Sequence, residues 1–391
     1  MMRSIEWSKL ADVAVRAMAL LVPRDRRLVI YGGATDRFID NAKYLFIWHN
    51  EHMKDYRHVW LTRRDDTLKR VQHLGYSACR SDSLRGWWLQ VRAGYYVADD
   101  HINHYASHNL SAGSVRINLW HGVPLKMIGW TRSDDDPSYQ PKGRIWERIF
   151  AQHLHGDYCL STHNSLNRNM SAALHFPLEH IYVGGYPRTL PLLVDDRKRE
   201  EMIVRYETEG TVNTYHDIQQ RDGRKIIYMP TFRDKDPDYL DKAIPDYSSL
   251  NDVLRQQGIT LYLKVHRETP TPDANAYSNI IVMDNAADVY PLLPLFDALI
   301  SDYSSITADF ALTHRPIALY TFDLEQYIGK SRPVFQRFWD VHKKITTISS
   351  FDELKQSLAC CNEWTIGDFM VADFFERPDD MDATRRLIES L

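Results

Sequence analysis

A hydroxyl-rich segment, Ser301-Asp302-Tyr303-Ser304-Ser305, has the composition of an anion-binding turn. The apolar residues Leu299-Ile300 before it predict a buried strand, and the spacing of Ile306 and Phe310 after it predicts a helix. A turn of this kind leaves backbone N–H groups unpaired at a helix N-terminus, where the helix dipole favours negative charge. The alternative is a simple cap, in which Ser304 or Ser305 closes the helix and nothing is bound.

Three further segments have a similar form, because each is a short apolar run that ends in polar or cationic residues. They are Asn118 to Lys126 (NLWHGVPLK), Tyr228 to Arg233 (YMPTFR) and Leu263 to Arg267 (LKVHR). Parallel strands deliver side chains to a crevice at their carboxyl ends in this way. The sequence therefore predicts that these polar residues gather at strand ends.

His121 is the first residue in these segments that suits acid–base chemistry. Gly122 and Pro124 predict a tight turn, from which the imidazole projects at the end of a strand. A histidine there can take a proton from a hydroxyl near neutral pH. Lys126 lies in the same segment and is a candidate phosphate contact; the alternative is an exposed, solvated lysine.

The segment that ends in Arg267 has the chemistry of a pyrophosphate clamp. Lys264 and His266 fall on the same face of the predicted strand. The planar fork of Arg267 can pair with two phosphate oxygens, although it could instead bridge Glu268. Thr231 and Arg233 come from a third strand end in the same part of the chain.

Two carboxylates lie close to these groups in the sequence. Asp302 would repel a phosphate, so we expect it to orient a cation or to accept from a polyol hydroxyl, and Asp309 is a candidate for the same role. Asp134-Asp135-Asp136 is interpreted as a solvated loop, since no strand precedes it. We expect no tightly bound metal. The sequence does not decide whether Mg²⁺ binds loosely together with a nucleotide.

Length and composition narrow the class of protein. A chain of 391 residues is comfortable for two domains, and the net charge of −4 gives no general attraction to nucleic acid. An anionic substrate must therefore be held by local cations. The four cysteines show no metal-ligand spacing and are interpreted as reduced thiols of a cytosolic protein.

Residues 1–27 differ from the rest of the chain. Trp7, Leu10, Ala14, Met18 and Leu21 form one face of a predicted amphipathic helix that ends at Pro23. No apolar run is long enough to span a bilayer. The helix either lies in the surface of the cytoplasmic membrane or packs on the body of the protein or on another subunit.

From residue 28 onward, short apolar runs alternate with helical stretches, which predicts βαβ units and parallel sheets. Gly184-Gly185-Tyr186-Pro187 punctuates the pattern, and residues 209–224 are expected to be a polar stretch. We predict an α/β protein with two Rossmann-like, doubly wound domains, 28–190 and 191–391, facing a cleft. The C-terminal helices of the second domain could cross back onto the first.

Taken in order, LWHGVPLK, YMPTFR, LKVHR and SDYSSITADFAL resemble the CDP-glycerol glycerophosphotransferase family, which includes teichoic-acid primases and polymerases and their capsule-polymerase relatives. Tyr31-Gly-Gly and Asp40-Asn41-Ala-Lys43-Tyr44 are similar to the family's opening strand and helix start. The resemblance covers roughly residues 28 to 330 and implies the two-domain arrangement called GT-B.

The resemblance also implies an activity. A hydroxyl of a lipid-linked or polymer acceptor attacks the β-phosphorus of CDP-glycerol or CDP-ribitol, and CMP leaves. It implies two catalytic histidines, His121 as general base and His266; donor contacts from Thr231, Arg233, Lys264, Arg267, Ser301, Asp302, Ser304 and Ser305; and acceptor or phosphate contacts from Lys126 and Asp309. Two other classes stay open, a sugar-nucleotide glycosyltransferase of the same architecture and a non-catalytic scaffold. A peripheral location on the cytoplasmic face of the membrane is expected, and an oligomer is compatible with the sequence.

Overall fold

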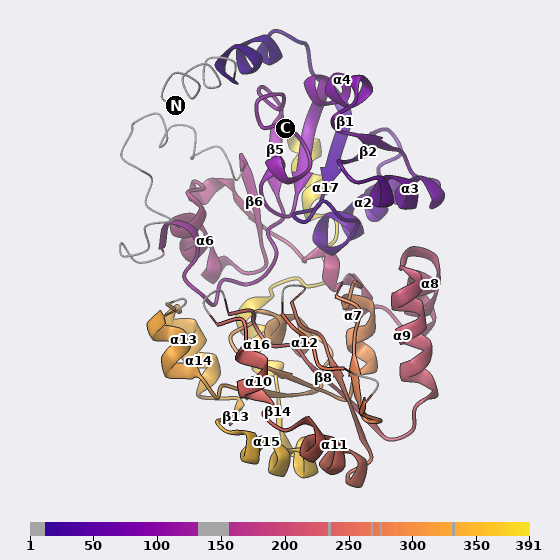
Figure 1. Ribbon diagram of the computed structural model, residues 1–391. Coiled ribbons are helices and arrows are strands. Elements are labelled where there is room, and N and C mark those ends of the chain that lie inside the picture. Colours follow the sequence, from indigo (N-terminus) through magenta and orange to yellow (C-terminus); the bar gives the residue numbers. More distant parts are fainter. Residues whose placement is uncertain are drawn as a thin grey trace, which may run out of the picture. The chain divides into compact units, whose positions relative to one another are not determined.

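The computed structural model describes residues 12–131, 156–233, 236–266, 269–273, 276–285, 287–330 and 333–391. The chain divides into two compact units (Figure 1). The first contains the described parts of Met1–His121, Gln140–Leu190 and Glu376–Leu391, and the second those of Gly122–Tyr139 and Pro191–Phe375. The C-terminal residues therefore group with the N-terminal unit.

The first unit is built on a parallel sheet with the strand order β3-β2-β1-β4-β5-β6-β7. Its central strands are buried, β4 throughout and β1 from Leu28 onward, as is typical of parallel sheets covered on both faces. The strands are β1 (Asp25–Gly32), β2 (Arg57–Thr62), β3 (Ala78–Arg80), β4 (Ala93–Ala98), β5 (Val115–Asn118), β6 (Tyr158–Ser161) and β7 (Ile181–Val183).

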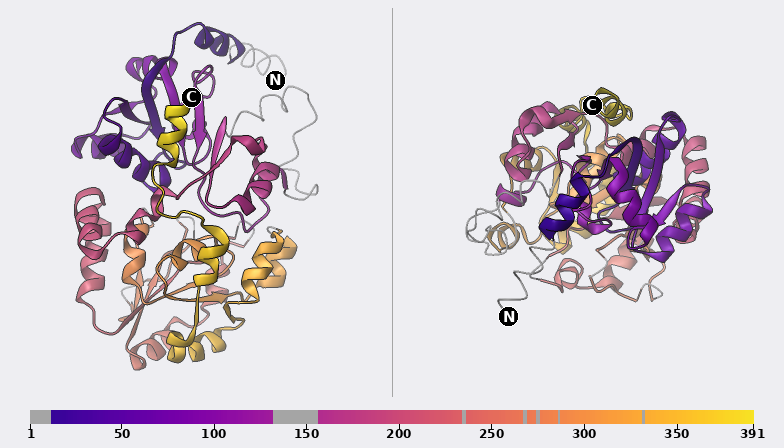
Figure 2. Two further views of the ribbon diagram at one scale, coloured as in Figure 1. Left: turned by 180° about the vertical axis from the view of Figure 1, so that it is seen from behind. Right: turned by 90° about the horizontal axis from the view of Figure 1, so that it is seen from above.

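Helices connect these strands and cover the sheet. They are α2 (Asp40–His52), α3 (Asp65–His73), α4 (Leu84–Arg92), η1 (Ile102–His104), η3 (Asn164–Leu166), α6 (Asn167–Leu174), η4 (Leu178–His180), η5 (Pro187–Thr189) and α17 (Ala383–Ser390), and residues 12–20 are also helical. Figure 2 shows α17 beside the strands, where the Tyr95 hydroxyl donates to the carbonyl of Ile388 at 3.2 Å.

The second unit contains a sheet with the order β10-β9-β8-β11-β12-β13, and β14 pairs with β12 in the antiparallel sense. The strands are β8 (Arg224–Tyr228), β9 (Ile259–Leu263), β10 (Ile280–Val282), β11 (Ala298–Ser301), β12 (Pro316–Tyr320), β13 (Thr346–Ile348) and β14 (Thr365–Ile366). The ladders along the main path are parallel.

The chain enters this unit in α7 (Leu190–Leu193). The other helices are η2 (Gly129–Thr131), α8 (Asp196–Tyr206), α9 (Glu209–Gln220), α10 (Tyr239–Ala243), α11 (Tyr247–Gln256), η7 (Tyr290–Leu295), α12 (Ile306–Ala311), α13 (Leu324–Lys330), α14 (Gln336–His342), α15 (Phe351–Ser357), η8 (Leu358–Glu363) and α16 (Asp368–Phe374).

The prediction of two parallel-sheet α/β domains is confirmed, and the strand predicted at Leu299-Ile300 is present as β11. The interpretation of residues 209–224 as a polar stretch was wrong, because α9 occupies most of it. Thr208 caps this helix by accepting from the Thr211 N–H at 3.3 Å, and Tyr215 and Ile218 are buried. Two buried apolar residues in a helix of twelve are too few to give a clear helical pattern in the sequence.

In each sheet the strand order reverses once, between β1 and β4 and between β8 and β11. Connections on either side of such a point turn to opposite faces, which opens a crevice at the carboxyl ends of the strands. The fold therefore offers one binding crevice in each unit. Within the described part of the chain, we find no helix with the length and apolar character needed to cross a membrane.

Candidate active site

The His121 turn follows β5 at the carboxyl edge of the first sheet. Trp120 is buried and has φ 55°, and its N–H donates to the Asn118 side chain at 2.8 Å. His121 is exposed, and its ring stacks on Trp120 with 4.2 Å between the centroids. A non-glycine residue with positive φ next to an exposed histidine is a form of backbone strain that concentrates at functional sites.

The ring of His121 is held in one tautomer. Its Nδ1 lies 3.2 Å from the carbonyl oxygen of Asp99, which follows β4. A carbonyl oxygen only accepts, so Nδ1 carries the hydrogen of the neutral ring and Nε2 carries the lone pair. The geometry therefore prepares Nε2 to receive a proton, as a general base requires.

The start of α2 and the segment after β7 hold the His121 turn through hydrogen bonds to its backbone. The Asn41 side chain donates to the carbonyl of Trp120 at 2.8 Å and accepts from the N–H of Arg188 at 3.0 Å. Arg188 in turn donates from Nη1 to the carbonyl of His121 at 2.8 Å and to the Asp40 carboxylate at 3.1 Å. Asn41 and Arg188 are both buried, so the hydrogen bonds are shielded from water.

The sequence motifs give Asn41 no role of its own and do not include Arg188. The signal for Asn41 was its place in the Asp40-Asn41 helix start, which also resembled the family. Asn41 contacts the His121 turn from 79 residues away in the sequence, and Arg188 contacts it from 67 residues away. No local sequence pattern predicts contacts between segments so far apart.

Asp99, whose backbone carbonyl contacts the His121 ring, has a buried carboxyl group. Its Oδ1 accepts from the N–H of Ala42 at 2.6 Å, while its Oδ2 has no hydrogen-bond partner among the described residues. Burial, followed by repulsion from Asp40, raises the pKa of Asp99 well above its usual range. Asp99 is therefore a candidate for a carboxyl group that stays protonated.

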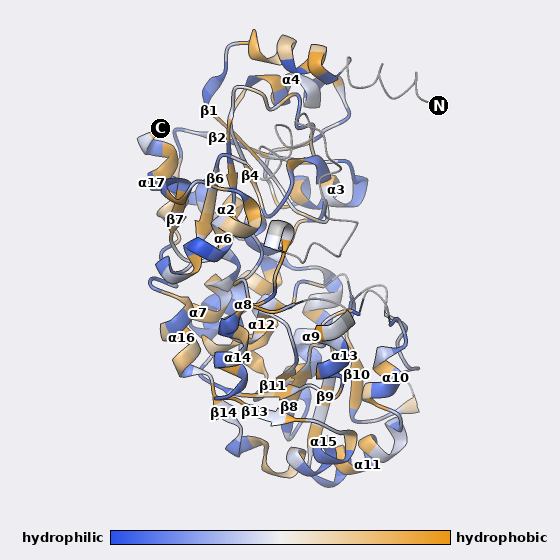
Figure 3. Cartoon of the chain, turned by 90° about the vertical axis from the view of Figure 1, so that its left-hand side faces the viewer, coloured by the Kyte–Doolittle hydropathy of each residue, from blue (hydrophilic) through white to orange (hydrophobic). Residues whose placement is uncertain are grey.

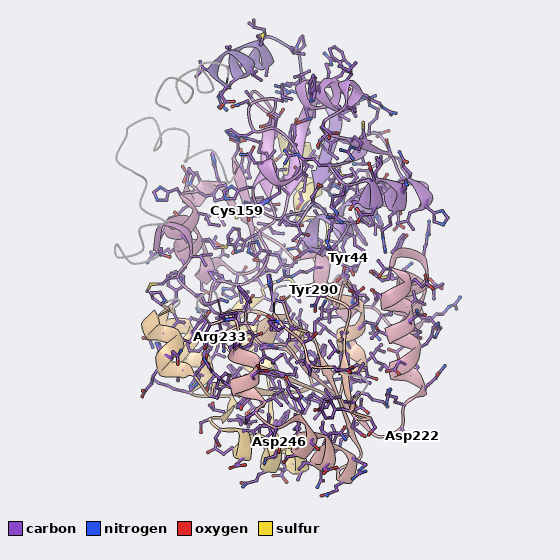
Figure 4. The ribbon with its side chains drawn as sticks, viewed as in Figure 1. Tyr44, Cys159, Asp222, Arg233, Asp246 and Tyr290 are labelled. Carbon is purple, nitrogen blue, oxygen red and sulfur yellow. The ribbon has the colours of Figure 1, made fainter. Side chains whose placement is uncertain are left out.

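In the second unit, Arg233 lies in the loop that follows β8 (Figure 4). Its guanidinium is 2% exposed and lies 2.9 Å from Asp302 and 2.8 Å from Asp323. The rings of Tyr303 and Tyr327 lie 4.8 Å from it. Burial lowers the pKa of Arg233, but the two carboxylates raise it above its ordinary value, so the cation is retained.

Asp302 joins the ends of β8 and β11. Besides its ion pair with Arg233, it accepts from the N–H of Thr231 at 2.9 Å and from the N–H of Tyr303. The Ser301 hydroxyl, also buried, donates to the carbonyl of Met229 at 2.7 Å. The polar groups of Ser301, Asp302 and Arg233 thus bond to one another and to the backbone, which fixes the two loops, and their contacts with a donor stay predictions.

Other predicted site residues of this unit, among them the second predicted catalytic histidine, are more accessible. His266 is exposed and packs on the Phe232 ring with 4.7 Å between centroids, and Ser304 and Ser305 are half-buried. The half-buried Lys264 donates to the carbonyl of Asp284 at 2.7 Å, and the Thr231 hydroxyl has no described hydrogen-bond partner. Arg267 lies outside the described residues.

The turn after β11 is partly a helix cap. The N–H of Ile306 donates to the Ser304 hydroxyl at 3.3 Å, and α12, which follows, has six residues. Asp309 on this helix is fully buried and accepts from the Tyr290 hydroxyl at 2.8 Å, so it is poorly placed to meet an acceptor. Lys126 lies in the second unit, where its backbone pairs with Val334.

Neither crevice shows a cluster of three or more metal-ligating side chains among the residues that the structure describes, and Asp134-Asp135-Asp136 lies outside them. A hollow of about 690 Å³ in the second unit is lined by Arg224 and Lys225, at the amino end of β8. It lies at the opposite edge of the sheet from the predicted residues, and parallel α/β sheets bind ligands at the carboxyl edge. We therefore do not assign this hollow to the substrate.

Two doubly wound sheets, each with polar residues at its switch point, are typical of enzymes that handle nucleotide-linked substrates. The chain belongs to the CDP-glycerol:poly(glycerophosphate) glycerophosphotransferase family, whose sequence model matches residues 14–363. The resemblance seen in the motifs is confirmed, and the chain is a member of a transferase family.

Individual relatives agree with this assignment. The chain is 25% identical over 342 residues to a teichoic acid poly(glycerol phosphate) polymerase of Bacillus spizizenii, which covers 84% of this chain and 82% of that protein. It is 23% identical over 365 residues to a teichoic acid glycerol-phosphate transferase of Staphylococcus aureus, covering 91% and 90%. The solved wall teichoic acid polymerase TagF has the same fold, with a TM-score of 0.75 at 20% identity over 100% of this chain and 95% of that one.

Proposed function

We propose that this enzyme moves glycerol phosphate from CDP-glycerol to a hydroxyl of a lipid-linked or oligomeric polyol-phosphate acceptor in teichoic acid synthesis, with release of CMP. Membership of the glycerophosphotransferase family and the two teichoic acid relatives support this substrate pair. A structure of TagF was obtained after a soak with CDPG. CDP-ribitol is the closest alternative donor, since a ribitol-phosphate primase is also a relative.

The observation that carries the mechanism is the hydrogen bond between His121 Nδ1 and the carbonyl of Asp99. The acceptor oxygen forms a bond to the β-phosphorus, while the bond between that phosphorus and the bridging oxygen of CMP breaks. Nε2 of His121 takes the proton of the acceptor hydroxyl as the new bond forms. Asn41 and Arg188 position the turn and do not touch the substrates.

The donor is assigned to the switch point of the second unit. Ser304, Ser305 and His266 offer accessible hydrogen-bonding groups there, and Arg267, which follows His266 in the sequence, is the cation that we expect to pair with the pyrophosphate. The buried Arg233–Asp302 pair keeps the β8 and β11 loops in register. Transfer requires a donor held by the second unit to reach His121 of the first, as the GT-B arrangement implied by the family resemblance would allow.

We place the enzyme on the cytoplasmic face of the membrane, because a lipid-linked acceptor is presented there. Of the predicted face of the N-terminal helix, Trp7 and Leu10 lie outside the described residues, whereas Met18 and Leu21 are exposed. Oligomer formation is not needed for the proposed chemistry, and no tightly bound cofactor is required by the residues assigned above.

The decisive experiment measures CMP release by the purified full chain with CDP-glycerol, CDP-ribitol and a panel of UDP-sugars, each with a soluble lipid-acceptor analogue. We expect CMP from CDP-glycerol at the highest kcat/KM, with and without EDTA. UDP release from a sugar nucleotide would show a glycosyltransferase instead. No product from any donor, by folded protein, would indicate a scaffold.

A further inference from the structure

Helix α4 presents three large apolar side chains to solvent. Leu84, Trp87 and Trp88 are 81%, 52% and 61% exposed, and their spacing of three and four residues places them on one face. Single exposed apolar residues are common in soluble proteins, but adjacent tryptophans with a leucine on one helical face are not. This exposed face, which we call the α4 patch, indicates an interaction surface.

The orientation of α4 is fixed by its opposite face. The side chain of Gln90 is buried and donates to the carbonyl of Ser81 at 2.8 Å. Gly86 packs so closely that an added Cβ would lie 2.0 Å from the carbonyl oxygen of Arg80. The helix therefore cannot rotate to bury the α4 patch without losing these contacts.

A second apolar group continues the α4 patch. Met18, Leu20 and Leu21, at the end of the helix that covers residues 12–20, are 59%, 59% and 84% exposed. The segment that follows them is tied to α4, since Arg24 donates to the carbonyl of Gln90 at 2.9 Å and Arg92 donates to that of Pro23 at 2.6 Å. Figure 3 shows the apolar colouring of this helix next to α4.

Cationic side chains border the α4 patch. A hollow of about 390 Å³ beside Trp88 is lined by Asp25, Leu28, Arg57, Arg85, Trp88, Leu89 and Arg92. Asp25 pairs with Arg57 at 3.0 Å, so two arginines exceed the acidic charge of the lining. Exposed Trp and Leu next to excess Arg match the boundary of an anionic bilayer, where rings enter the headgroup layer and guanidinium groups meet phosphates.

We propose that the α4 patch, together with Met18, Leu20 and Leu21, docks this enzyme on the surface of an anionic phospholipid bilayer. This proposal names the surface that would hold the enzyme at the membrane. It rests on the proposed function in one respect, because a lipid-linked acceptor is the reason for the enzyme to bind a membrane. The side chains named here are different from those assigned to the base, to its support and to the donor.

The test is vesicle flotation of the full chain. Wild-type protein should float with vesicles that contain phosphatidylglycerol, and the Trp87→Ser/Trp88→Ser variant should lose at least about tenfold in partitioning. Arg85→Glu should weaken binding to phosphatidylglycerol vesicles and leave binding to neutral phosphatidylcholine vesicles unchanged. Val204→Ser is the matched control, because Val204 is 61% exposed on α8 and belongs to the second unit.

Thermal melts check that each variant is folded, and CMP release with a soluble acceptor should be unchanged. Wild-type flotation by the tryptophan variant overturns the proposal. So does a drop in its sedimentation mass, which would make the patch an interface between two copies. If flotation behaves as expected but wild type releases no CMP from CDP-glycerol, the proposed function fails and the docking surface stands.

Discussion

Arg188 donates a hydrogen bond from Nη1 to the backbone carbonyl of His121 at 2.8 Å, while its own N–H is held by Asn41. A side chain from the segment after β7 thereby fixes the backbone of the turn after β5. A shift of about 1 Å in a reacting group can cost on the order of a hundredfold in rate. The arginine can thus influence catalysis without touching a substrate.

Replacement of Arg188 should therefore affect turnover more than donor binding. We expect Arg188→Ala to lower kcat by about ten- to a hundredfold, with the Kd for CDP-glycerol changed by only a few fold, and Arg188→Lys to recover part of the loss. Asn41→Ala should be less than additive with it, since both act on one turn. Arg197→Ala, at an exposed arginine of α8, is the control. Unchanged kcat in folded Arg188→Ala protein would contradict the positioning role.

Removal of the base should separate chemistry from donor binding. His121→Ala is expected to abolish transfer while calorimetry shows the affinity for the CDP donor within a few fold of wild type, because a general base acts on the acceptor in the transition state. His73→Ala, at an exposed histidine of α3, should behave as wild type. Turnover by His121→Ala at the wild-type rate would remove His121 from the mechanism.

Arg233 should matter for stability. Its loss leaves the buried carboxylate of Asp302 and the half-buried carboxylate of Asp323 without their cation, and breaking a buried ion pair costs about 3–5 kcal/mol. Chemical denaturation of Arg233→Ala should show a loss of that order. Arg255→Ala removes an exposed pair with Asp252 and should change stability by less than about 1 kcal/mol. Equal stability of the two variants would mean that the Arg233 cluster is not structural.

Arg267 and Ser304 should matter for the donor. A charge-assisted hydrogen bond contributes about 1.5–3 kcal/mol, so Arg267→Ala should weaken CDP-donor binding by about ten- to a hundredfold, and Ser304→Ala by less. Calorimetric titration with CDP-glycerol measures both, with thermal melts to show that neither variant is destabilised. If both variants bind the donor as wild type does, the donor site lies elsewhere.

Asp99 should make stability depend on pH. Because its pKa is raised in the folded state, folded protein binds more protons than unfolded protein between the two pKa values, so stability falls as pH rises through that window. Each pH unit in the window costs wild type about 1.4 kcal/mol. Asp99→Asn keeps the acceptor for the Ala42 N–H and has no proton to lose, so we expect a flatter pH profile and a larger unfolding free energy at pH 8. A less stable variant at pH 8 would show that the charged carboxylate is favoured.

The sequence by itself determined the class of fold, most of the strands along the chain and the segments that follow their carboxyl ends, because apolar runs and turn residues are local signals. It also singled out His121 and the family. It did not identify α9 or the short strand β3, since both carry few apolar residues.

Only the tertiary structure decided which polar residues pair with one another inside the protein and which support the His121 turn. Arg233 and Asp302 were predicted to contact the donor, yet they satisfy each other inside the second unit, and Asp309 is buried against Tyr290. Arg188 and Asp40 meet across 148 residues of chain to support the His121 turn. Side-chain pairing at that separation depends on which strands become neighbours in the sheet, and hydrophobic periodicity along the chain does not encode it.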